Sequence, residues 1–387
     1  MSDTADSFDV VVVGGGAMGC AVAAFLLDEP AFHGRVAVVE RDPTYREASS
    51  ALSASSIRQQ FSTPENIRMS AYSFGFIRDS LGLDIREGGY LYLAPPASRG
   101  ILEANHAIQV AEGADVVLLT PSELVARYPW LATDGIALGS LGRSGEGWFD
   151  GYGLVQAFRA RARDLGAELL TAEVVGMDVN GGRVASVTLD DGSKRACGSV
   201  VDAAGPWAAR IAAMAGIDLP VEARRRCVFV FDVERDAPED CPLIIDTSGV
   251  WFRPEGGSFI TGAAPADQDD LPDLPLTPDH ALFESVLWPA LANRVPAFDA
   301  IRVTNAWAGY YEMNTFDHNA IIGRHPEITN LLFANGFSGH GIQQSPAVGR
   351  AIAELIVHDR FVTTDLSVFG FERIAAGRRV VEQNVIG

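Results

Sequence analysis

The fold is decided by residues 9–40, which read DVVVVGGGAMGCAVAAFLLDEPAFHGRVAVVE. Four consecutive valines open the stretch, and an apolar β-branched run of this kind is typical of a parallel strand buried on both faces. Three glycines, a run of small apolar residues through Leu27 and a second apolar run at residues 35–40 follow. This order predicts a strand, a tight turn, a helix and a second parallel strand. The glycines interrupt the apolar run Phe8–Leu27, so we expect no transmembrane segment there.

The spacing of the glycines predicts a dinucleotide site. Gly14, Gly16 and Gly19 form the pattern G-x-G-x-x-G. The first allows the tight turn, the second lets a pyrophosphate approach the backbone, and the third packs the helix against the strand. Glu40 ends the second strand roughly 20 residues later, where a carboxylate accepts hydrogen bonds from ribose hydroxyls. An acid there disfavours NADP, but the motif alone does not distinguish FAD from NAD.

Further strands and helices extend in both directions from this unit. Strands are expected at residues 89–93, 173–178, 183–189, 199–205, 221–233, 249–262 and 330–336, and helices at residues 98–112, 152–166 and 345–357. Pieces typical of a dinucleotide-binding fold lie at both ends of the chain and in its middle. We therefore predict an α/β protein in which a Rossmann-like nucleotide-binding domain (residues 1–85, 142–218 and 318–387) is interleaved with an antiparallel-sheet α+β substrate domain (residues 86–141 and 219–317).

The composition excludes several classes of protein. The net charge is −20, whereas nucleic-acid binding requires a basic face, so we expect no nucleic acid as a partner. Four cysteines, Cys20, Cys197, Cys227 and Cys241, lack the spacing of a metal site or a disulfide framework. Together with an N-terminus that lacks the features of a signal peptide, they predict a cytoplasmic protein without a metal.

Three further segments resemble a known family. They are VVER at residues 38–41 leading into ASSALSASSIRQQF at 48–61, then VDAAGPW at 201–207, and GFSGHGIQQ at 336–344. These segments resemble the glycine and sarcosine oxidase-like FAD-dependent amine oxidoreductases of the D-amino-acid-oxidase superfamily. The serine-rich run is similar to that of mitochondrial FAD-dependent oxidoreductase domain proteins. The resemblance extends over essentially the whole chain and implies FAD as the cofactor.

The resemblance also implies a role for individual positions. Near the pyrophosphate and ribose it places Gly14, Gly16, Ala17, Met18 and Glu40, and along the path from adenosine to the ring it places Arg41, Ser49, Ser50 and Ser53. Val174 is expected at the adenine, and Ala204 and Gly205 close to the cofactor. The segment Gly339, His340, Gly341, Ile342 and Gln343 is expected beneath the isoalloxazine, with the following helix start facing the edge where reduction places negative charge.

Arg58 is the candidate for binding a substrate carboxylate. Relatives with carboxylate substrates carry an arginine after the serine-rich loop, and Arg58 occupies that place. A guanidinium pairs with a carboxylate in two-pronged fashion and so orients the substrate. The alternative is a structural salt bridge, for example to Glu65.

Tyr311 and His340 are the other two catalytic candidates. Trp307–Glu312 matches the segment that passes over the flavin face, where Tyr310 or Tyr311 could bind substrate or pack against the ring. Glycine-type oxidases place an arginine near Tyr311, and its absence here gives Arg58 more weight. His340 is either a positive partner of reduced flavin or a structural hydrogen-bonding residue.

Two departures from the family concern the flavin and its electron acceptor. The stretch near residue 309 holds no cysteine and Leu52 stands where some relatives have a histidine, so we predict a non-covalent flavin. Lys194 is the only lysine in the chain, and Ile260 and Gln343 stand where relatives carry lysines. We therefore expect O₂ to be a poor acceptor, and a quinone or an electron-transfer protein to serve instead.

The predicted reaction is oxidation of a secondary amine or amino acid of the N-methylglycine type, by hydride transfer to flavin N5 and hydrolysis of the imine. The substrate is expected to be a small, amino-acid-like carboxylate. Three alternatives remain: a 2-hydroxy-acid dehydrogenase on the same fold, a non-catalytic flavoprotein that acts as an assembly factor, and an NAD-dependent enzyme, which the C-terminal loop disfavours.

Overall fold

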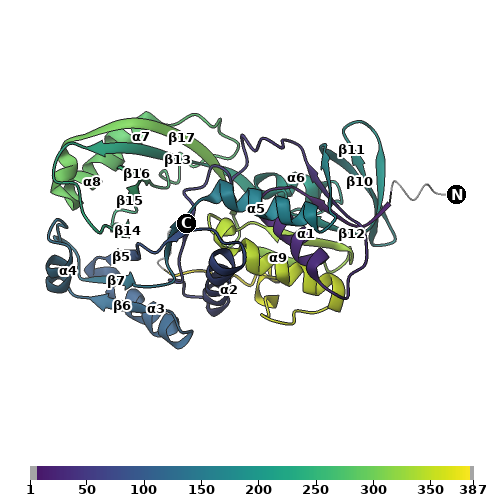
Figure 1. The fold of residues 1–387 in the computed structure, drawn as a ribbon, viewed down its shortest axis with the longest axis horizontal. Coiled ribbons are helices and arrows are strands. Elements are labelled where there is room, and N and C mark those ends of the chain that lie inside the picture. The colour runs from purple at the N-terminus through teal and green to yellow at the C-terminus, as the bar shows by residue number, and fades with distance from the viewer. Residues whose placement is uncertain (1–6, 384–387) are drawn as a thin grey trace.

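Two large sheets lie side by side in the computed structural model, which describes residues 7–383. In Figure 1 the sheet with its parallel strands and surrounding helices occupies the right side, and the mostly antiparallel sheet occupies the left. Residues 1–6 and 384–387 lie outside the described range. The first six contributed to the prediction that a signal peptide is absent, and the last four belong to the predicted nucleotide-binding domain.

The first sheet, called here the parallel sheet, contains the predicted βαβ unit. Its central strands run in the order β19 (Leu331–Asn335), β12 (Lys194–Asp202), β1 (Ser7–Val13), β2 (Val36–Glu40) and β9 (Glu168–Thr171), all parallel. Three antiparallel strands extend it: β10 (Val174–Asn180), β11 (Arg183–Leu189) and β18 (Ile321–Arg324). The central valines of β1 are buried on both faces, as the run of four valines predicts.

Helices cover both faces of the parallel sheet. On one face α1 (Ala17–Asp28) packs against α5 (Gly151–Asp164) and α9 (Gly341–His358), and α9 packs against α2 (Pro64–Gly75). The helix α1 is almost entirely buried and rich in alanine, which lets these helices approach closely. Short helices lie at the other face and near the C-terminal end of the chain: α6 (Ala208–Ala213) and α10 (Glu372–Ala375).

The second sheet, called here the antiparallel sheet, has eight strands. Their order is β17 (Ile301–Asn314), β13 (Val221–Val233), β16 (Ser258–Gly262), β15 (Trp251–Glu255), β14 (Leu243–Ile245), β5 (Tyr90–Ala94), β7 (Leu138–Gly142) and β6 (Val116–Leu119). Within residues 7–383, β14 and β5 are the one parallel pair of this sheet. Its flanking helices are α3 (Arg99–Ala111), α4 (Pro121–Arg127), α7 (His280–Leu282) and α8 (Trp288–Arg294). A core around Phe229, Phe231 and Phe298 joins β13 to these helices.

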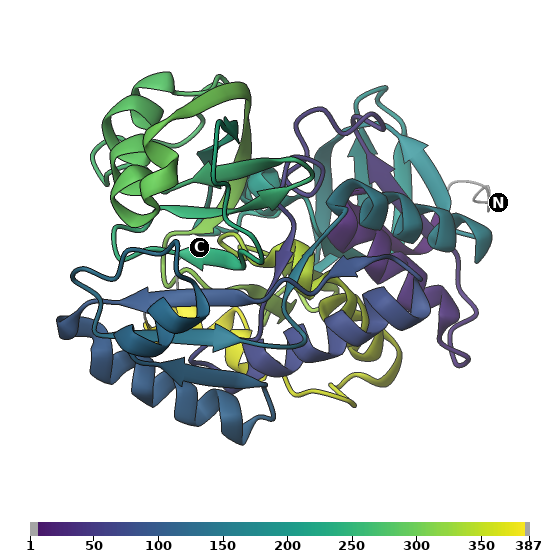
Figure 2. The same ribbon diagram turned by 60° about the vertical axis from the view of Figure 1, so that its left-hand side comes forward.

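A small sheet and the end of the chain connect the two large sheets. The small sheet consists of β3 (Ser56–Ile57), β8 (Gly147–Phe149) and β4 (Ile85–Arg86). Figure 2 shows α9 and the C-terminal segment between the halves of the molecule. There the Glu382 carboxylate accepts hydrogen bonds from the backbone and hydroxyl of Ser62, and the Gln383 carbonyl accepts one at 2.7 Å from the side-chain amide of Asn105 on α3.

The predicted fold class is confirmed in its main features, and one detail differs. Strands of the parallel sheet come from residues 7–40, 168–202 and 321–335, and strands of the antiparallel sheet from residues 90–142 and 221–314. The helix expected at residues 345–357 begins earlier, at Gly341, because His340 is its N-cap residue. Residues 341–343 therefore form a first helical turn, not a loop as predicted. Among the described residues, no helix is long and apolar enough to span a membrane.

Candidate cofactor and substrate site

One large cavity lies between the two sheets and is lined by both. We call the part formed by the turn before α1, the end of β2, the serine-rich loop and residues 172–174 and 203–207 the α1 half. The β13 half is formed by the antiparallel sheet, with Tyr90, Arg226, Trp251 and Tyr311 among its lining side chains. The start of α9 and Arg58 lie where the halves meet.

Backbone approaches the cavity at the start of α1 because the glycines leave room for it. Gly14 has φ of +101°, and a Cβ there would collide with the carbonyl oxygen of Ala203. A Cβ on Gly19 would collide with the carbonyl oxygen of Gly14. The N-cap residue Gly16 provides no side-chain cap, and α1 has no acid in its first turn. The positive end of the helix therefore faces the cavity with no acid in its own first turn, as suits a pyrophosphate site.

Glu40 is fixed by backbone amides at the end of β2. Its two carboxylate oxygens accept hydrogen bonds from the Gly15 and Asp42 amides, both at 2.8 Å. Each oxygen retains a lone pair for a further donor, which suits the binding of ribose hydroxyls. The Tyr45 hydroxyl donates to the Gly15 carbonyl at 2.9 Å and stabilises the same turn, a contact that sequence reasoning missed.

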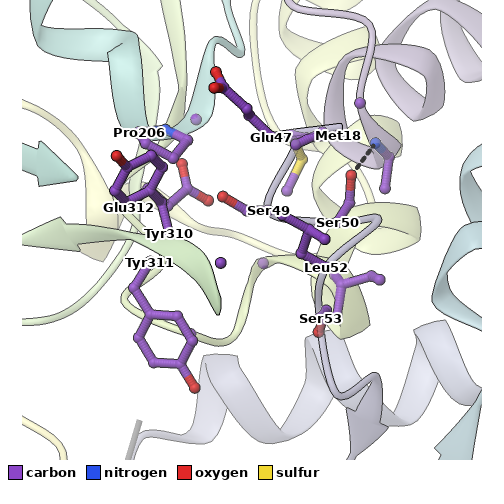
Figure 3. Close-up of a pocket in the computed structure, with 18 of the residues that line it drawn as sticks. Met18, Glu47, Ser49, Ser50, Leu52, Ser53, Pro206, Tyr310, Tyr311 and Glu312 are labelled. Carbon is purple, nitrogen blue, oxygen red and sulfur yellow. Dashed lines mark hydrogen bonds between the residues drawn. The ribbon is translucent and has the colours of Figure 1, made fainter. Parts of the chain in front are cut away.

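The serine-rich loop lies beside the start of α1 and lines the cavity with it (Figure 3). Ser50 Oγ accepts a long hydrogen bond of 3.4 Å from the Ala17 amide. Ser49 Oγ is buried without a hydrogen-bond partner among the described residues. A buried hydroxyl that lacks a partner is costly, and a polar ligand in the cavity would satisfy it. Ser53 lines the same wall.

Arg41 and residues 203–207 form the opposite wall of the α1 half. The Arg41 guanidinium lies 3.7 Å from the centre of the Trp207 ring and pairs with Glu47 at 3.3 Å. Val174, Ala204 and Gly205 line the cavity as well. The predicted adenosine and ribose positions are thus brought together on one side of the cavity.

At the start of α9, backbone faces the cavity while two side chains turn away from it. Gly339, Gly341 and Ile342 line the cavity. His340 is buried, and its Nε2 lies 2.8 Å from an Arg58 guanidinium nitrogen. Gln343 Oε1 accepts a hydrogen bond from the Arg58 backbone amide at 2.9 Å. The side chains of His340 and Gln343, both predicted at the cofactor, therefore position Arg58.

Burial, together with the neighbouring positive charge of Arg58, lowers the pKa of His340 well below its usual value. The imidazole is therefore neutral at pH 7 and accepts the hydrogen bond from Arg58. The structure does not support the interpretation of His340 as a positive partner of reduced flavin, because a second cation beside Arg58 is unfavourable.

Arg58 reaches the cavity from β3 and the segment after it. One guanidinium nitrogen lies 3.3 Å from the Tyr90 hydroxyl, and the guanidinium packs over the rings of Phe61, Tyr90 and Tyr92. The aromatic faces of these three rings stabilise the positive charge of the guanidinium beside the cavity.

Tyr310, Tyr311 and Glu312 come from β17 and have different surroundings (Figure 3). The Tyr310 hydroxyl donates to the Leu274 carbonyl at 2.7 Å, so Tyr310 has a structural role. Tyr311 lines the β13 half. Glu312 Oε2 accepts a hydrogen bond from the Gly336 amide at 3.1 Å, and burial raises the pKa of its carboxyl to about 8. Glu312, which sequence reasoning missed, is therefore mostly protonated at neutral pH.

Arg226 is the second residue that sequence reasoning missed. It lies on β13, opposite Gly309 of β17, and its guanidinium carbon lies 5.1 Å from the centre of the Tyr311 ring. An arginine is thus near Tyr311 after all, supplied by the neighbouring strand. The signal in the sequence was the run Arg224–Arg226 in an expected strand, but its partner strand was not predictable.

These features fit FAD. The α1 half offers a glycine turn, a helix N-terminus, a fixed carboxylate and an unpartnered hydroxyl to a dinucleotide, and the start of α9 faces the junction where the ring would lie. Within residues 7–383 no group of three or more side chains is arranged to hold a metal ion.

Comparisons with known proteins agree with this geometry. The family model described as FAD dependent oxidoreductase (DAO) matches residues 9–355. The chain is 42% identical to FAD-dependent oxidoreductase domain-containing protein 1 of Xenopus laevis, over 98% of this chain and 85% of that protein. It is 27% identical to the glycine oxidase of Bacillus licheniformis, over 96% and 99% of the two chains.

Solved structures show the same fold. The L-proline dehydrogenase from P. horikoshii superposes with a TM-score of 0.86 at 27% identity, covering 97% of this chain and 100% of that one. The glycine oxidase from Geobacillus kaustophilus gives 0.80 at 23% identity, covering 99% and 100%. The chain therefore belongs to the DAO family of FAD-dependent oxidoreductases, and its cofactor is FAD.

Proposed function

We propose that the protein oxidises the C–N bond of a secondary amine or amino acid of the N-methylglycine type. The observation that carries this proposal is Arg58, a buried cation at the junction of the two halves of the cavity. The relatives named glycine oxidase and L-proline dehydrogenase support the substrate class. When bound, FAD supplies a two-electron acceptor that takes hydride at N5.

The residues of the β13 half orient and shield the substrate. Arg58 binds the carboxylate in two-pronged fashion, and its orientation is set by His340 and by the backbone bond to Gln343. Tyr311 and Tyr90 pack around the substrate, and this packing excludes water from the reacting carbon. Glu312, held protonated by burial, adds no negative charge that would repel the carboxylate. The amine binds in its neutral form, and the imine product is hydrolysed by water after oxidation.

Anaerobic titration of the purified flavoprotein tests the proposal. Sarcosine, N-methylated amino acids, proline and glycine are compared with 2-hydroxyglutarate and lactate, while the visible absorption of the flavin is followed. Bleaching by an amine alone supports the proposal. Bleaching by a 2-hydroxy acid alone supports the alternative of a 2-hydroxy-acid dehydrogenase. A flavin that none of these compounds reduces favours a role as an assembly factor.

A quinone or an electron-transfer protein is the proposed acceptor. Lys194, the only lysine, is exposed on β12 and pairs with Asp178 at 2.7 Å, away from the cavity. At the junction Arg58 contacts the neutral His340 and Tyr90, and in the β13 half Arg226 pairs with Asp270. Slow reoxidation of the reduced protein in air, and fast reoxidation by a soluble quinone, are the expected results. Fast reoxidation in air would contradict this part of the proposal.

A non-covalent flavin belongs to the same proposal. Of the four cysteines, Cys227 is the one that lines the cavity, and its sulfur accepts a bond from the Asp279 amide at 3.4 Å. Acid precipitation is expected to release all yellow colour into solution, from the native protein and from Cys227→Ser alike. Colour that stays with the native polypeptide would refute the proposal.

A further inference from the structure

Arg226 faces the cavity from a strand that carries three consecutive arginines. Its side chain is only 10% exposed and lines the β13 half. Its neighbour Arg225 contacts instead the carbonyls of Pro275 and Thr277 in the segment that leads to α7. Arg226 thus lies at the cavity, whereas Arg225 binds the backbone of the segment before α7.

The partner of Arg226 is a carboxylate held in two-pronged geometry. The two terminal nitrogens of Arg226 lie 2.7 and 3.0 Å from the two oxygens of Asp270. One of these nitrogens also donates to the Arg225 carbonyl at 2.9 Å. The Nε of Arg226 is buried and has no hydrogen-bond partner among residues 7–383. The guanidinium therefore has an unused donor inside the cavity wall.

Asp270 belongs to a segment without regular secondary structure, which individual hydrogen bonds and ion pairs hold against β13 and β17. Residues 265–279 contain no helix or named strand, and their backbone meets β13 in a single isolated bridge, between Arg224 and Pro272. The segment contains five aspartates: Asp267, Asp269, Asp270, Asp273 and Asp279. The Asp270 side chain is 21% exposed, so water can solvate it if it leaves Arg226. The free-energy cost of replacing Asp270 by another carboxylate is therefore small compared with the cost of leaving Arg226 unpaired.

Tyr311 lies close to both arginines of the cavity. The Arg226 guanidinium packs over its ring, and the charges of both Arg226 and Arg58 act to lower the pKa of the hydroxyl, although burial raises it overall. A ligand that rests against Tyr311 therefore lies near two cationic side chains, those of Arg58 and Arg226.

We propose that Arg226 binds a second carboxylate of the substrate, which displaces Asp270, so that the substrate is an amino acid with two carboxylates. Arg58 binds the carboxylate next to the reacting carbon, and Arg226 binds the distal one. This inference rests on the proposed function for the identity of the reacting group, but the binding of two carboxylates is measurable without turnover.

Calorimetric titration of the FAD-loaded, oxidised protein tests the inference with ligands that cannot be oxidised. Succinate, glutarate and adipate are each compared with butyrate, valerate and hexanoate, the monocarboxylates of the same length. At least one dicarboxylate is expected to bind about tenfold more tightly than the monocarboxylate of the same length, because a second bidentate charge pair forms. Equal affinities within every pair would overturn the inference, whichever amine or hydroxy acid reduces the flavin.

Substitutions at three positions test which residues cause the preference for the dicarboxylate. Arg226→Gln is expected to reduce the affinity for the preferred dicarboxylate to that of the monocarboxylate, and Arg226→Lys to give an intermediate value because it keeps the charge without the fork. Asp270→Asn removes the competing carboxylate and is expected to tighten dicarboxylate binding severalfold. Arg225→Gln, the matched control, loosens the same segment and is expected to leave the preference unchanged.

Two results with the variants would also overturn the inference. One is a preference for the dicarboxylate that survives in both Arg226 variants. The other is a loss of the preference in Asp270→Asn, which would show that the ion pair only maintains the structure of the segment. The melting temperature and flavin content of each variant identify any that fold poorly, and Arg226→Lys then takes the place of Arg226→Gln.

Discussion

The two halves of the cavity present different kinds of surface to a ligand. In the α1 half, backbone atoms and small residues form the wall, and Gly14, Gly16 and the first turn of α1 follow one another in the chain. In the β13 half and at the junction, large side chains form the wall, and Arg58, Arg226 and Tyr311 come from three distant segments. The first surface is specified by local conformation and the second by the pairing of strands, so substitutions in the two halves should have different effects.

Gly14→Ala is expected to have the largest effect, loss of bound FAD. A side chain at φ of +101° costs roughly 1–3 kcal/mol, and the Cβ would also collide with the Ala203 carbonyl, so the turn must move. The visible absorption of the purified protein measures the flavin content. Gly100→Ala, on the exposed face of α3 with open space around it, is the control and should retain a full complement of flavin.

Arg58→Ala should weaken the binding of carboxylate ligands without affecting the binding of FAD. We expect FAD to remain bound and the affinity for carboxylate ligands to fall roughly 100-fold, because truncation of a buried charged partner costs about 2–5 kcal/mol. Titration of the flavin spectrum with sarcosine or acetate measures the loss. Unchanged affinity would remove Arg58 from the substrate site, and loss of the flavin would show that the two halves are not separable.

Glu40→Gln should weaken FAD binding by roughly tenfold, a smaller effect than that of Gly14→Ala. Glutamine presents one NH₂ group where Glu40 accepts bonds from the Gly15 and Asp42 amides, so one donor loses its acceptor. Fluorescence titration of the apoprotein with FAD gives the affinity. Glu168→Gln, on the surface at β9, serves as the control, and an equal loss in both variants would contradict the role given to Glu40.

Glu312→Gln should have the smallest effect on ligand binding, and its main effect should be on the pH dependence of stability. Burial raises the pKa of the Glu312 carboxyl from 4.5 to about 8, so unfolding releases a proton between these values. Stability is therefore lost as pH rises from about 5 to about 8, by up to roughly 1.4 kcal/mol per pH unit. Denaturant titrations across this range should show a flatter profile for Glu312→Gln than for the native protein or the exposed control Glu284→Gln.

The same contrast explains what the sequence could predict. The βαβ unit was predictable, because the valines of β1, the glycine turn and Glu40 all lie within residues 9–40 and follow one another in a fixed pattern. Arg226 was not, because its position over Tyr311 depends on the register of β13 against β17, which lies some 80 residues further along. The side chains of His340 and Gln343 were placed at the flavin, yet they turn toward Arg58 because α9 begins at Gly341.

A crystal structure of the FAD-loaded protein with a bound amino-acid carboxylate tests the central claim most directly. The account predicts the diphosphate at the start of α1, the flavin ring at the junction near Gly341, and the ligand carboxylate on Arg58. A carboxylate bound away from Arg58, or a ring outside the junction of the two halves, would contradict it.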